Sequence, residues 1–360
     1  MLMPLKFINT GQSSFFLTLR KRVDAYFKQK GLSPHANGPM WAKALFFLTG
    51  YGLLYGLILS GLFSLWAMLA LTLLLGAFAA FIGFNVSHDA LHGAFSSRNW
   101  VNQLLGSTFY LVGASPYVWK ITHNTVHHTY TNIPGHDEDI EIAPGLIRLN
   151  PEEEHRPWQR YQHLYGFPLY SLSSLSWVFR KDYLKFFKKK IGQHANTDHP
   201  RREYFTLFFS KIAYYFFFLL LPYLVLDITW WQLVVGFLGM HLAEGLVLAL
   251  VFQLAHVVEG TAFPLPSQEG SIQEAWAIHQ LGTTANFAPR SAIAAFVCGG
   301  LNRQIEHHLF PKVCHIHYPA LAVIVRQTAQ EHGLPYLENK SLFSALGSHY
   351  RLLKKLGRKA

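Results

Sequence analysis

The sequence predicts an all-α integral membrane protein with four transmembrane helices in two hairpins and a cytoplasmic helical cap that carries clusters of histidines. Three observations predict this fold class. Of 360 residues, 51% are hydrophobic and only 14% are charged, whereas about 25% of the residues in soluble proteins are charged. The apolar residues gather in four long runs, and most of the 20 histidines lie outside these runs. This composition excludes an ordinary soluble enzyme and a disordered chain.

The four apolar runs are residues 44–62, 65–86, 207–226 and 230–256. Each is long enough to cross a bilayer, which takes about 20 residues at a rise of 1.5 Å each. Short linkers at 60–64 and 227–229 join the runs in pairs, so we expect two hairpins. The predicted divisions are an N-terminal segment (1–43), a first hairpin (44–86), a middle segment (87–206), a second hairpin (207–256) and a C-terminal segment (257–360).

The basic residues predict the orientation of these spans. The chain has a net charge of +11, and its 31 Lys and Arg lie outside the two short linkers, with Lys211 at the entry of the third span. Because Lys and Arg are retained on the cytoplasmic side, we expect both termini and the middle segment to be cytoplasmic. The positive charge then indicates contact with anionic membrane lipids and no nucleic-acid partner.

Two further segments carry a prediction of their own. Residues 177–191 mix aromatic and basic side chains, which favours a helix lying on the membrane surface; a solvated basic loop is the alternative. Residues 101–119 are moderately apolar but short, so we expect an interfacial or re-entrant segment there and no fifth span.

Three histidine clusters carry the functional signal. His88 and His92 directly follow the second span, His123, His127 and His128 lie in the middle segment, and Gln304, His307 and His308 lie in the tail. Side chains three or four apart share one helix face, so each cluster presents its imidazoles together. A single HxxxH spacing is expected by chance in a chain this rich in histidine, whereas HxxxHH is not.

The seven clustered histidines predict metal binding. Imidazoles without thiolates suit Fe, Cu, Zn or Ni, and the only two cysteines, Cys298 and Cys314, cannot form a thiolate cluster. Seven imidazoles exceed the four ligands of one zinc site, so we expect two metal ions, and redox-active iron fits an apolar setting best. The alternative for any one histidine is an ordinary polar side chain.

Other polar residues could complete the site. His256 ends the fourth span, where an ionisable side chain at membrane depth indicates function; a carbonyl-bonded interfacial histidine is the alternative. His279 is a weaker candidate. Metal-bound histidine needs an acceptor for its other nitrogen, and the acidic residues within or near the clusters are candidates for this role: Asp89, Asp137, Glu138, Asp139 and Glu306.

These residues resemble the three histidine boxes of the membrane fatty acid desaturases. His88 to His92 is similar to the first box (HxxxH), His123 to His128 to the second (HxxxHH), and Gln304 to His308 to the third in the QxxHH form of front-end desaturases, of the delta-5 or delta-6 kind. The resemblance implies that the metal ligands are His88, His92, His123, His127, His128, His256, His307 and His308. It leaves open whether Gln304 touches the metal.

The resemblance also implies the chemistry. It implies two non-haem Fe ions that use O2 and two electrons to insert a cis double bond into a fatty acyl chain. The His-Pro-Gly-Gly motif of a fused cytochrome b5 domain is absent from the sequence, where His199 and Pro200 are followed by Arg201. We therefore expect a separate electron donor, either a ferredoxin or a cytochrome b5. A bacterial inner membrane is favoured over the endoplasmic reticulum.

Three other functions stay open at this point. A related di-iron fatty acyl hydroxylase would use the same scaffold. A haem-binding electron carrier is disfavoured because its histidines usually face each other within the membrane spans. A transporter, which would use Lys211 and Glu244 as intramembrane charges, is disfavoured by having only four spans. The sequence does not indicate the acyl chain length, the bond position or the carrier of the acyl group.

Overall fold

The computed structural model describes residues 5–8, 14–150 and 153–358, and most of these residues are helical. Four of the described helical segments are long and apolar enough to cross a membrane: Gly38–Leu59, Leu65–Leu91, Arg201–Val225 and Trp230–His256. The first is α2 and the last is α13; the second contains α3 (Leu65–Ile82) and α4 (His88–Leu91), and the third contains α11 (Arg201–Tyr215) and α12 (Leu221–Val225). The predicted helical membrane architecture is therefore confirmed.

Local sequence signals set the ends of these helices. α2 begins at Gly38, earlier than residue 44, because the side chain of Asn37 accepts a hydrogen bond from the backbone of Met40 and Pro39 fits the first turn. Ser64 caps α3 in the same way. The third span begins at Arg201, so Lys211 lies within it, buried and 2.7 Å from Asp182.

The two hairpins pack closely through α3 and α13. Gly76 of α3 lies directly against the backbone of Met240 in α13, where an added Cβ would be 2.0 Å from the carbonyl oxygen. Small residues allow such close backbone approach between membrane helices. Large apolar side chains on the outer faces of the bundle are exposed, including Leu53, Phe205 and Leu224, as lipid contact requires.

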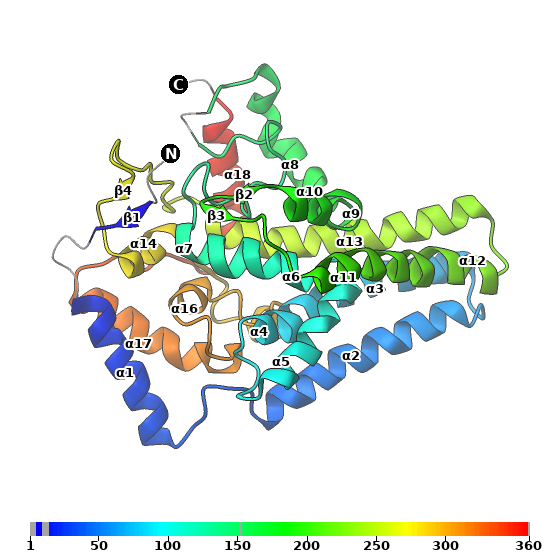
Figure 1. Ribbon diagram of the computed structural model, residues 1–360, viewed down its shortest axis with the longest axis horizontal. Helices are drawn as coiled ribbons and strands as arrows, with labels where there is room; N and C mark the ends of the chain where they lie inside the picture. Colours follow the sequence, from blue (N-terminus) through cyan, green and yellow to red (C-terminus); the bar gives the residue numbers. More distant parts are fainter. Residues whose placement is uncertain (1–4, 9–13, 151–152, 359–360) are drawn as a thin grey trace.

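The remaining elements form a cap at one end of the four long helices, on the left in Figure 1, while the long helices extend to the right. Its helices are α1 (Ser14–Lys30), α5 (Asn99–Gly106), α6 (Pro116–Trp119), α7 (His128–Tyr130), α8 (Gln162–Ser171), α9 (Ser173–Ser176), α10 (Asp182–Phe187), α14 (Trp276–Thr283), α15 (Ala292–Val297), α16 (Gln304–Leu309), α17 (Tyr318–Glu331) and α18 (Leu342–Leu356).

Short strand pairs tie distant cap segments together. β1 (Lys6–Phe7) is parallel to β4 (Ser271–Ile272), β2 (Lys190–Ile191) is antiparallel to β3 (His194–Ala195), and β5 (Asn286–Phe287) is parallel to β6 (Glu338–Asn339). The parallel pairs join residues far apart in the chain. They therefore fix the N-terminal and C-terminal segments against the loops that surround the histidines.

The expected surface helix at 177–191 is shorter than the sequence suggested. A π-helical turn, Trp177–Lys181, leads into α10, which ends at Phe187, and β2 follows. Phe179, Leu184 and Phe187 are about half exposed, which fits an amphipathic interfacial segment. Strand pairing with β3 replaces the helix beyond Lys188.

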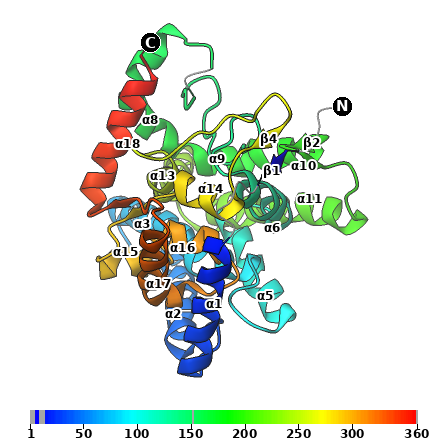
Figure 2. The ribbon, with the colours of Figure 1, turned by 90° about the vertical axis from the view of Figure 1, so that its left-hand side faces the viewer.

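An apolar core shared with α1 and α17 supports α14 and α16. Every fourth residue of α1 is buried, which makes one continuous apolar stripe. This stripe shares a core with α14, α16 and α17, whose buried residues include Leu281, Ile305, Leu321 and Val325. Figure 2, which looks at the cap end, shows α1 and α17 beside α16. The helix that carries the third histidine cluster, α16, is therefore fixed by packing against α1, α14 and α17.

A separate apolar cavity of ≈ 280 Å³ lies between the hairpins. Its walls include residues 65–75 of α3 and 231–240 of α13, together with parts of α2 and α12. These residues belong to the ends of α3 and α13 that are remote from His88 and His256.

Candidate metal centre

The eight predicted ligands come from four separate segments and are all buried. His88 and His92 lie at the end of the second span, His123 and His127 lie in the π-helical turn between α6 and α7, and His128 begins α7. His256 ends α13, and His307 and His308 lie on α16. The most exposed of the eight, His92, is only 9% exposed. Folding therefore gathers residues that are far apart in the sequence at one end of the membrane helices.

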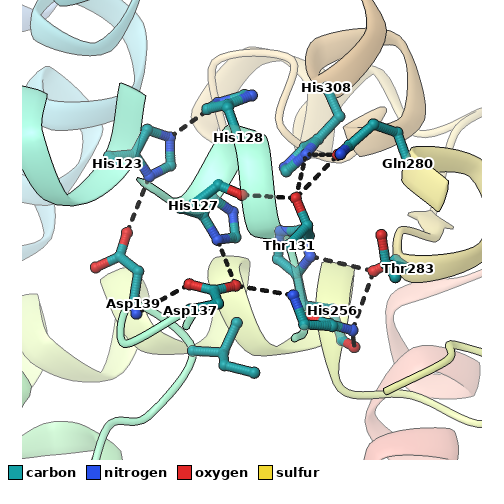
Figure 3. Close-up of polar contacts among 12 residues, drawn as sticks. His123, His127, His128, Thr131, Asp137, Asp139, His256, Gln280, Thr283 and His308 are labelled. Carbon is teal, nitrogen blue, oxygen red and sulfur yellow. Dashed lines mark hydrogen bonds and ion pairs between the residues drawn. The ribbon is translucent and has the colours of Figure 1, made fainter. Parts of the chain in front are cut away.

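The ligand atoms fall into overlapping groups. Within the described residues, nitrogens of His88, His92, His123 and His307 lie within 4.8 Å of one another, and so do those of a second group, His127, His256 and His308. A third group, His128 with His307 and His308, connects the two. Figure 3 shows the rings of the second group and of His123 and His128 turned toward a common region.

The free nitrogens of these rings are the strongest sign of a missing ligand. Among the described residues, the Nε2 atoms of His88, His92, His127, His307 and His308 are buried and have no hydrogen-bond partner. An unpaired buried polar atom costs about 1–3 kcal/mol, so five of them in one place are not expected in a stable core. Metal ions coordinated by these atoms would remove that cost, and an imidazole-rich set suits iron.

Local backbone geometry places two of the clusters. A π-helical turn, Gly83–Ser87, precedes His88, and a longer one, Lys120–His127, contains the first two histidines of the second cluster. π-turns are rare and occur mostly at functional sites. They change the angle between successive side chains, and the His123 and His127 rings stack with their centroids 4.9 Å apart.

Two carboxylates fix the second cluster. His127 Nδ1–H donates to Asp137 Oδ2 at 2.8 Å, and His123 Nδ1–H donates to Asp139 Oδ2 at 2.9 Å (Figure 3). Lys181 in turn lies 3.0 Å from Asp139 Oδ1. Each carboxylate selects the tautomer that leaves Nε2 free for a metal. The predicted roles of Asp137 and Asp139 fit these contacts.

Neutral groups lie beside the Nδ1 atoms of three other rings. His256 Nδ1 lies 3.3 Å from the carbonyl oxygen of Thr283, and His307 Nδ1 lies 3.1 Å from the hydroxyl of Tyr318. His308 Nδ1 lies 2.8 Å from Gln280 Oε1. No spacing pattern in the sequence marks Tyr318, because it belongs to α17. Residues 276, 279, 280 and 283, in contrast, form a helical i, i+3, i+4, i+7 pattern.

Hydrogen bonds of the Asn132 side chain join three segments behind the second cluster. Asn132 has a left-handed backbone with a φ of 58°, a conformation that Asn tolerates better than most residues. Its Nδ2 lies within 3.2 Å of the carbonyl oxygens of His256, Ala262 and Thr283. Its backbone N–H donates to Asp137 Oδ2 at 2.9 Å. The carboxylate that orients His127 is therefore itself fixed.

Three of the acidic residues expected to accept from cluster histidines have other partners. Glu138 pairs with Lys185 and Lys188, and Glu306 bonds Asn286 and Tyr336, so neither acts as the acceptor for a cluster histidine. Asp89 lies 3.8 Å from His88 Nδ1 and accepts instead from His315 Nδ1 at 2.9 Å.

His279 and Gln304 lie in different positions relative to the histidine groups. His279 is outside the metal-compatible groups found among the described residues, and its Nε2–H donates to the carbonyl of Thr131 at 2.8 Å. Gln304 Nε2 lies 3.0 Å from His256 Nε2. Gln304 is thus at the edge of the second group, while His279 serves the surrounding framework.

Comparison with known proteins agrees with this site. The protein-family model for "Fatty acid desaturase" matches residues 64–340, which include all eight histidines. The chain belongs to the fatty acid desaturase family. It is therefore an oxidoreductase that desaturates fatty acyl chains, and with its four apolar helices it is a membrane protein. This membership replaces the haem-carrier and transporter alternatives.

Relatives of this desaturase match it along most of its length. The sn-1 linoleoyl-lipid 6-desaturase of Synechocystis sp. is 38% identical over 362 residues, covering 97% of both chains. The enzyme of the same name from Arthrospira platensis is 37% identical, covering 94% of this chain and 91% of its own. The acyl-lipid (8-3)-desaturase of Physcomitrium patens is 35% identical over 98% of this chain and 74% of its own.

Burial keeps most cluster imidazoles of the desaturase neutral. It lowers the pKa of His123 to about 3, against the influence of Asp139. Burial and neighbouring imidazoles hold the pKa values of four more rings well below their usual range: His92, His128, His307 and His308. Neutral imidazole is the form that binds a metal, so these ligands are ready at physiological pH.

The pKa values of Asp139 and His127 are shifted so that each group favours its charged form. Burial raises the pKa of Asp139, but Lys181 and His123 outweigh it and hold that pKa well below its usual range. Burial lowers the pKa of His127, but the Asp137 carboxylate outweighs it and raises that pKa. Ionised carboxylates behind the rings strengthen the imidazoles as ligands.

Proposed function

We propose that the eight histidines hold two non-haem iron ions and that the protein is an O2-dependent, front-end acyl-lipid desaturase. The observation that carries the proposal is the set of five buried Nε2 atoms without a hydrogen-bond partner among the described residues. The family match covers the same residues. Imidazoles without a thiolate are a suitable ligand set for redox-active iron.

The two groups assign the ligands to the two ions. His88, His92, His123 and His307 would hold the first iron, and His127, His256 and His308 the second. His128 lies between them, since its nitrogen is close to those of His307 and His308. When bound, the iron pair supplies the oxidising power from O2 that removal of hydrogen from an unactivated CH2 requires.

The side chains around the rings orient them and exclude water. Asp137 and Asp139 hold protons on the Nδ1 atoms of His127 and His123. Trp119 stacks on His123 with centroids 4.2 Å apart, and Phe252 of α13 contacts the same ring edge-on at 5.5 Å. This apolar cover suits a hydrocarbon substrate and keeps solvent from the reacting carbon atoms.

The names of the relatives support the substrate class. Two cyanobacterial relatives are named sn-1 linoleoyl-lipid 6-desaturases and a third relative an acyl-lipid (8-3)-desaturase. We therefore infer an acyl chain esterified to a membrane lipid, into which a cis double bond is inserted on the carboxyl side of an existing one. The QxxHH form of the third cluster, Gln304 to His308, agrees with this position.

The proposal extends to the surroundings of the enzyme. We infer that the cap and both termini face the cytoplasm, because the Lys and Arg residues lie at that end. The electrons would come from a separate ferredoxin or cytochrome b5. A bacterial inner membrane fits the similarity to cyanobacterial enzymes over almost their whole length.

Expression in a host supplied with defined fatty acids tests the function. Mass spectrometry of the lipids is expected to show a product lacking two hydrogens, with the new bond nearer the carboxyl end. His128→Ala and His307→Ala are expected to abolish this product and reduce bound iron. His194→Ala, a partly exposed histidine of β3, is the matched control and keeps wild-type activity.

Other outcomes would contradict the proposal. A product that gains one oxygen atom would identify a hydroxylase on the same scaffold. Near-normal turnover by well-folded, iron-poor His128→Ala or His307→Ala protein would show that the assigned residues do not bind the catalytic metals.

A further inference from the structure

One face of α14 lies against the metal centre. Trp276, His279, Gln280 and Thr283 have the spacing i, i+3, i+4 and i+7, which places them on one side of a helix. Three of these four residues are buried. In Figure 3 Gln280 and Thr283 lie beside His308 and His256.

Three residues of this face bond the backbone or rings of the histidine clusters. Trp276 Nε1–H donates to the carbonyl of His128 at 3.0 Å. His279 Nε2–H donates to the carbonyl of Thr131 at 2.8 Å. The carbonyl of Thr283 lies 3.3 Å from His256 Nδ1. α14 therefore connects the second cluster with the end of α13.

Gln280 makes the most direct contact with a predicted ligand. Its Oε1 lies 2.8 Å from His308 Nδ1 and accepts a hydrogen bond from Thr131 Oγ1 at 2.9 Å. Gln280, Thr131 and His308 are all 0% exposed. Thr131 Oγ1 is also 2.7 Å from the carbonyl oxygen of His127, so Gln280 Oε1 and that carbonyl share the single hydroxyl proton of Thr131.

We propose that Gln280 is a positioning residue for the second metal ion. Gln280 Oε1 accepts a hydrogen bond from His308 Nδ1–H. This bond keeps His308 Nε2 unprotonated and directed at the ion. This inference rests on the metal centre of the proposed function. Gln280 does for His308 with a neutral amide what Asp137 does for His127 with a carboxylate.

The arrangement predicts an effect confined to one ion. Removing the acceptor leaves His308 Nδ1–H with only a longer contact, at 3.3 Å from Thr131 Oγ1, and so weakens the hold on the ring. Loss of such an outer partner costs about 10- to 100-fold in metal affinity. None of the first group, His88, His92, His123 and His307, bonds Gln280, and two of its rings have other partners, Asp139 for His123 and Tyr318 for His307, so the first ion is expected to be retained.

Three variants of the full-length protein in detergent test this inference. Gln280→Met keeps the side-chain length but removes the acceptor, and Gln280→Glu keeps the acceptor. Gln253→Met is the matched control, because Gln253 is equally buried on α13 but donates to the carbonyl of Ile140 at 3.0 Å. Bound iron is titrated with a competing chelator, and Mössbauer spectra separate the two iron environments.

We expect Gln280→Met to release one of its two irons at roughly 10- to 100-fold lower chelator concentration and to change one Mössbauer doublet only. Gln280→Glu and Gln253→Met should follow the wild type. The inference is overturned if Gln280→Met retains both irons normally, if both irons weaken together, or if Gln253→Met behaves like Gln280→Met. Should Gln280→Met not fold, a weakened second iron in Gln280→Glu overturns it as well.

The result is separable from the proposed function. A wild-type protein that binds no iron and forms no unsaturated product would refute the proposed function itself. A wild type with two irons and full activity, combined with an unaffected Gln280→Met, would refute only the role of Gln280.

Discussion

The two histidine groups differ in the number of imidazoles and in the kind of partner behind them. The first group has four imidazoles, and the second has three with the amide of Gln304 beside them. In the second group, Asp137 supports one ring while neutral groups of Gln280 and Thr283 support the others. If each group holds one ion, as proposed, this difference predicts that the second ion is held less tightly and depends more on hydrogen bonds from outside the ligand set.

The largest expected effect separates a histidine that also belongs to the connecting group from one that belongs to a single group. His307 belongs to the first group and to the connecting group, whereas His256 belongs only to the second. His307→Ala is expected to lose both irons, and His256→Ala to lose one. Iron analysis of the purified proteins measures this. Equal loss of iron in the two variants would break the distinction between the groups.

Removal of the two carboxylates should also give separable results. Asp139→Asn weakens support for His123 in the first group, and Asp137→Asn weakens support for His127 in the second. Each change is expected to lower the affinity for its own ion about 10- to 100-fold. Chelator titration of each variant tests this, and a loss of the same ion in both would contradict the assignment.

Lower pH should destabilise the metal-free protein. The folded-state pKa values of five buried imidazoles lie below the ordinary 6.5: His92, His123, His128, His307 and His308. Below about pH 6.5 the unfolded chain therefore binds more protons than the folded one, so stability is lost as the pH falls. Each group contributes up to about 1.4 kcal/mol per pH unit.

Unfolding midpoints of the metal-free protein between pH 7 and pH 5 test this dependence. The raised pKa of His127 acts in the opposite direction. It concerns one imidazole, whereas five imidazoles have lowered pKa values. Bound iron should reduce the dependence, because metal binding also holds the rings neutral. A midpoint that stays constant or rises on acidification would mean that the rings are not buried and neutral together.

The smallest effect is expected at Lys181. This residue is 27% exposed at its side chain and pairs with Asp139 at 3.0 Å. Partly exposed ion pairs contribute roughly 0–1 kcal/mol, so Lys181→Met should change stability by less than about 1 kcal/mol and leave both irons bound. A large loss of the first iron would show that Asp139 requires its lysine partner to orient His123.

The histidine clusters show how far local sequence reasoning reaches. HxxxHH and QxxHH carry the ligand types in short segments, and His256 is marked by its depth in an apolar helix. Tyr318 and Thr131 have no such signal, since their roles depend on helices that meet only after folding. Gln280 is intermediate, because its helical spacing with Trp276 and Thr283 is visible but its target is not.

The transmembrane half shows the same limit. The four spans were predictable because each is a continuous apolar run, but the place of the cavity between the hairpins was not. Its position depends on how α2 and α12 separate from α3 and α13. The π-turns before His88 and at His123 likewise arise from packing and leave no clear mark in composition.

The sequence by itself determined that the protein has four membrane helices and enough imidazoles for two metal ions. A bilayer acts on each apolar segment of about 20 residues independently of its neighbours, so hydropathy alone is sufficient. Only the tertiary structure decided which histidine nitrogens lie together and which groups orient their rings. Convergence of ring nitrogens within a few ångströms requires four distant segments to pack in one arrangement, and no local pattern encodes that distance.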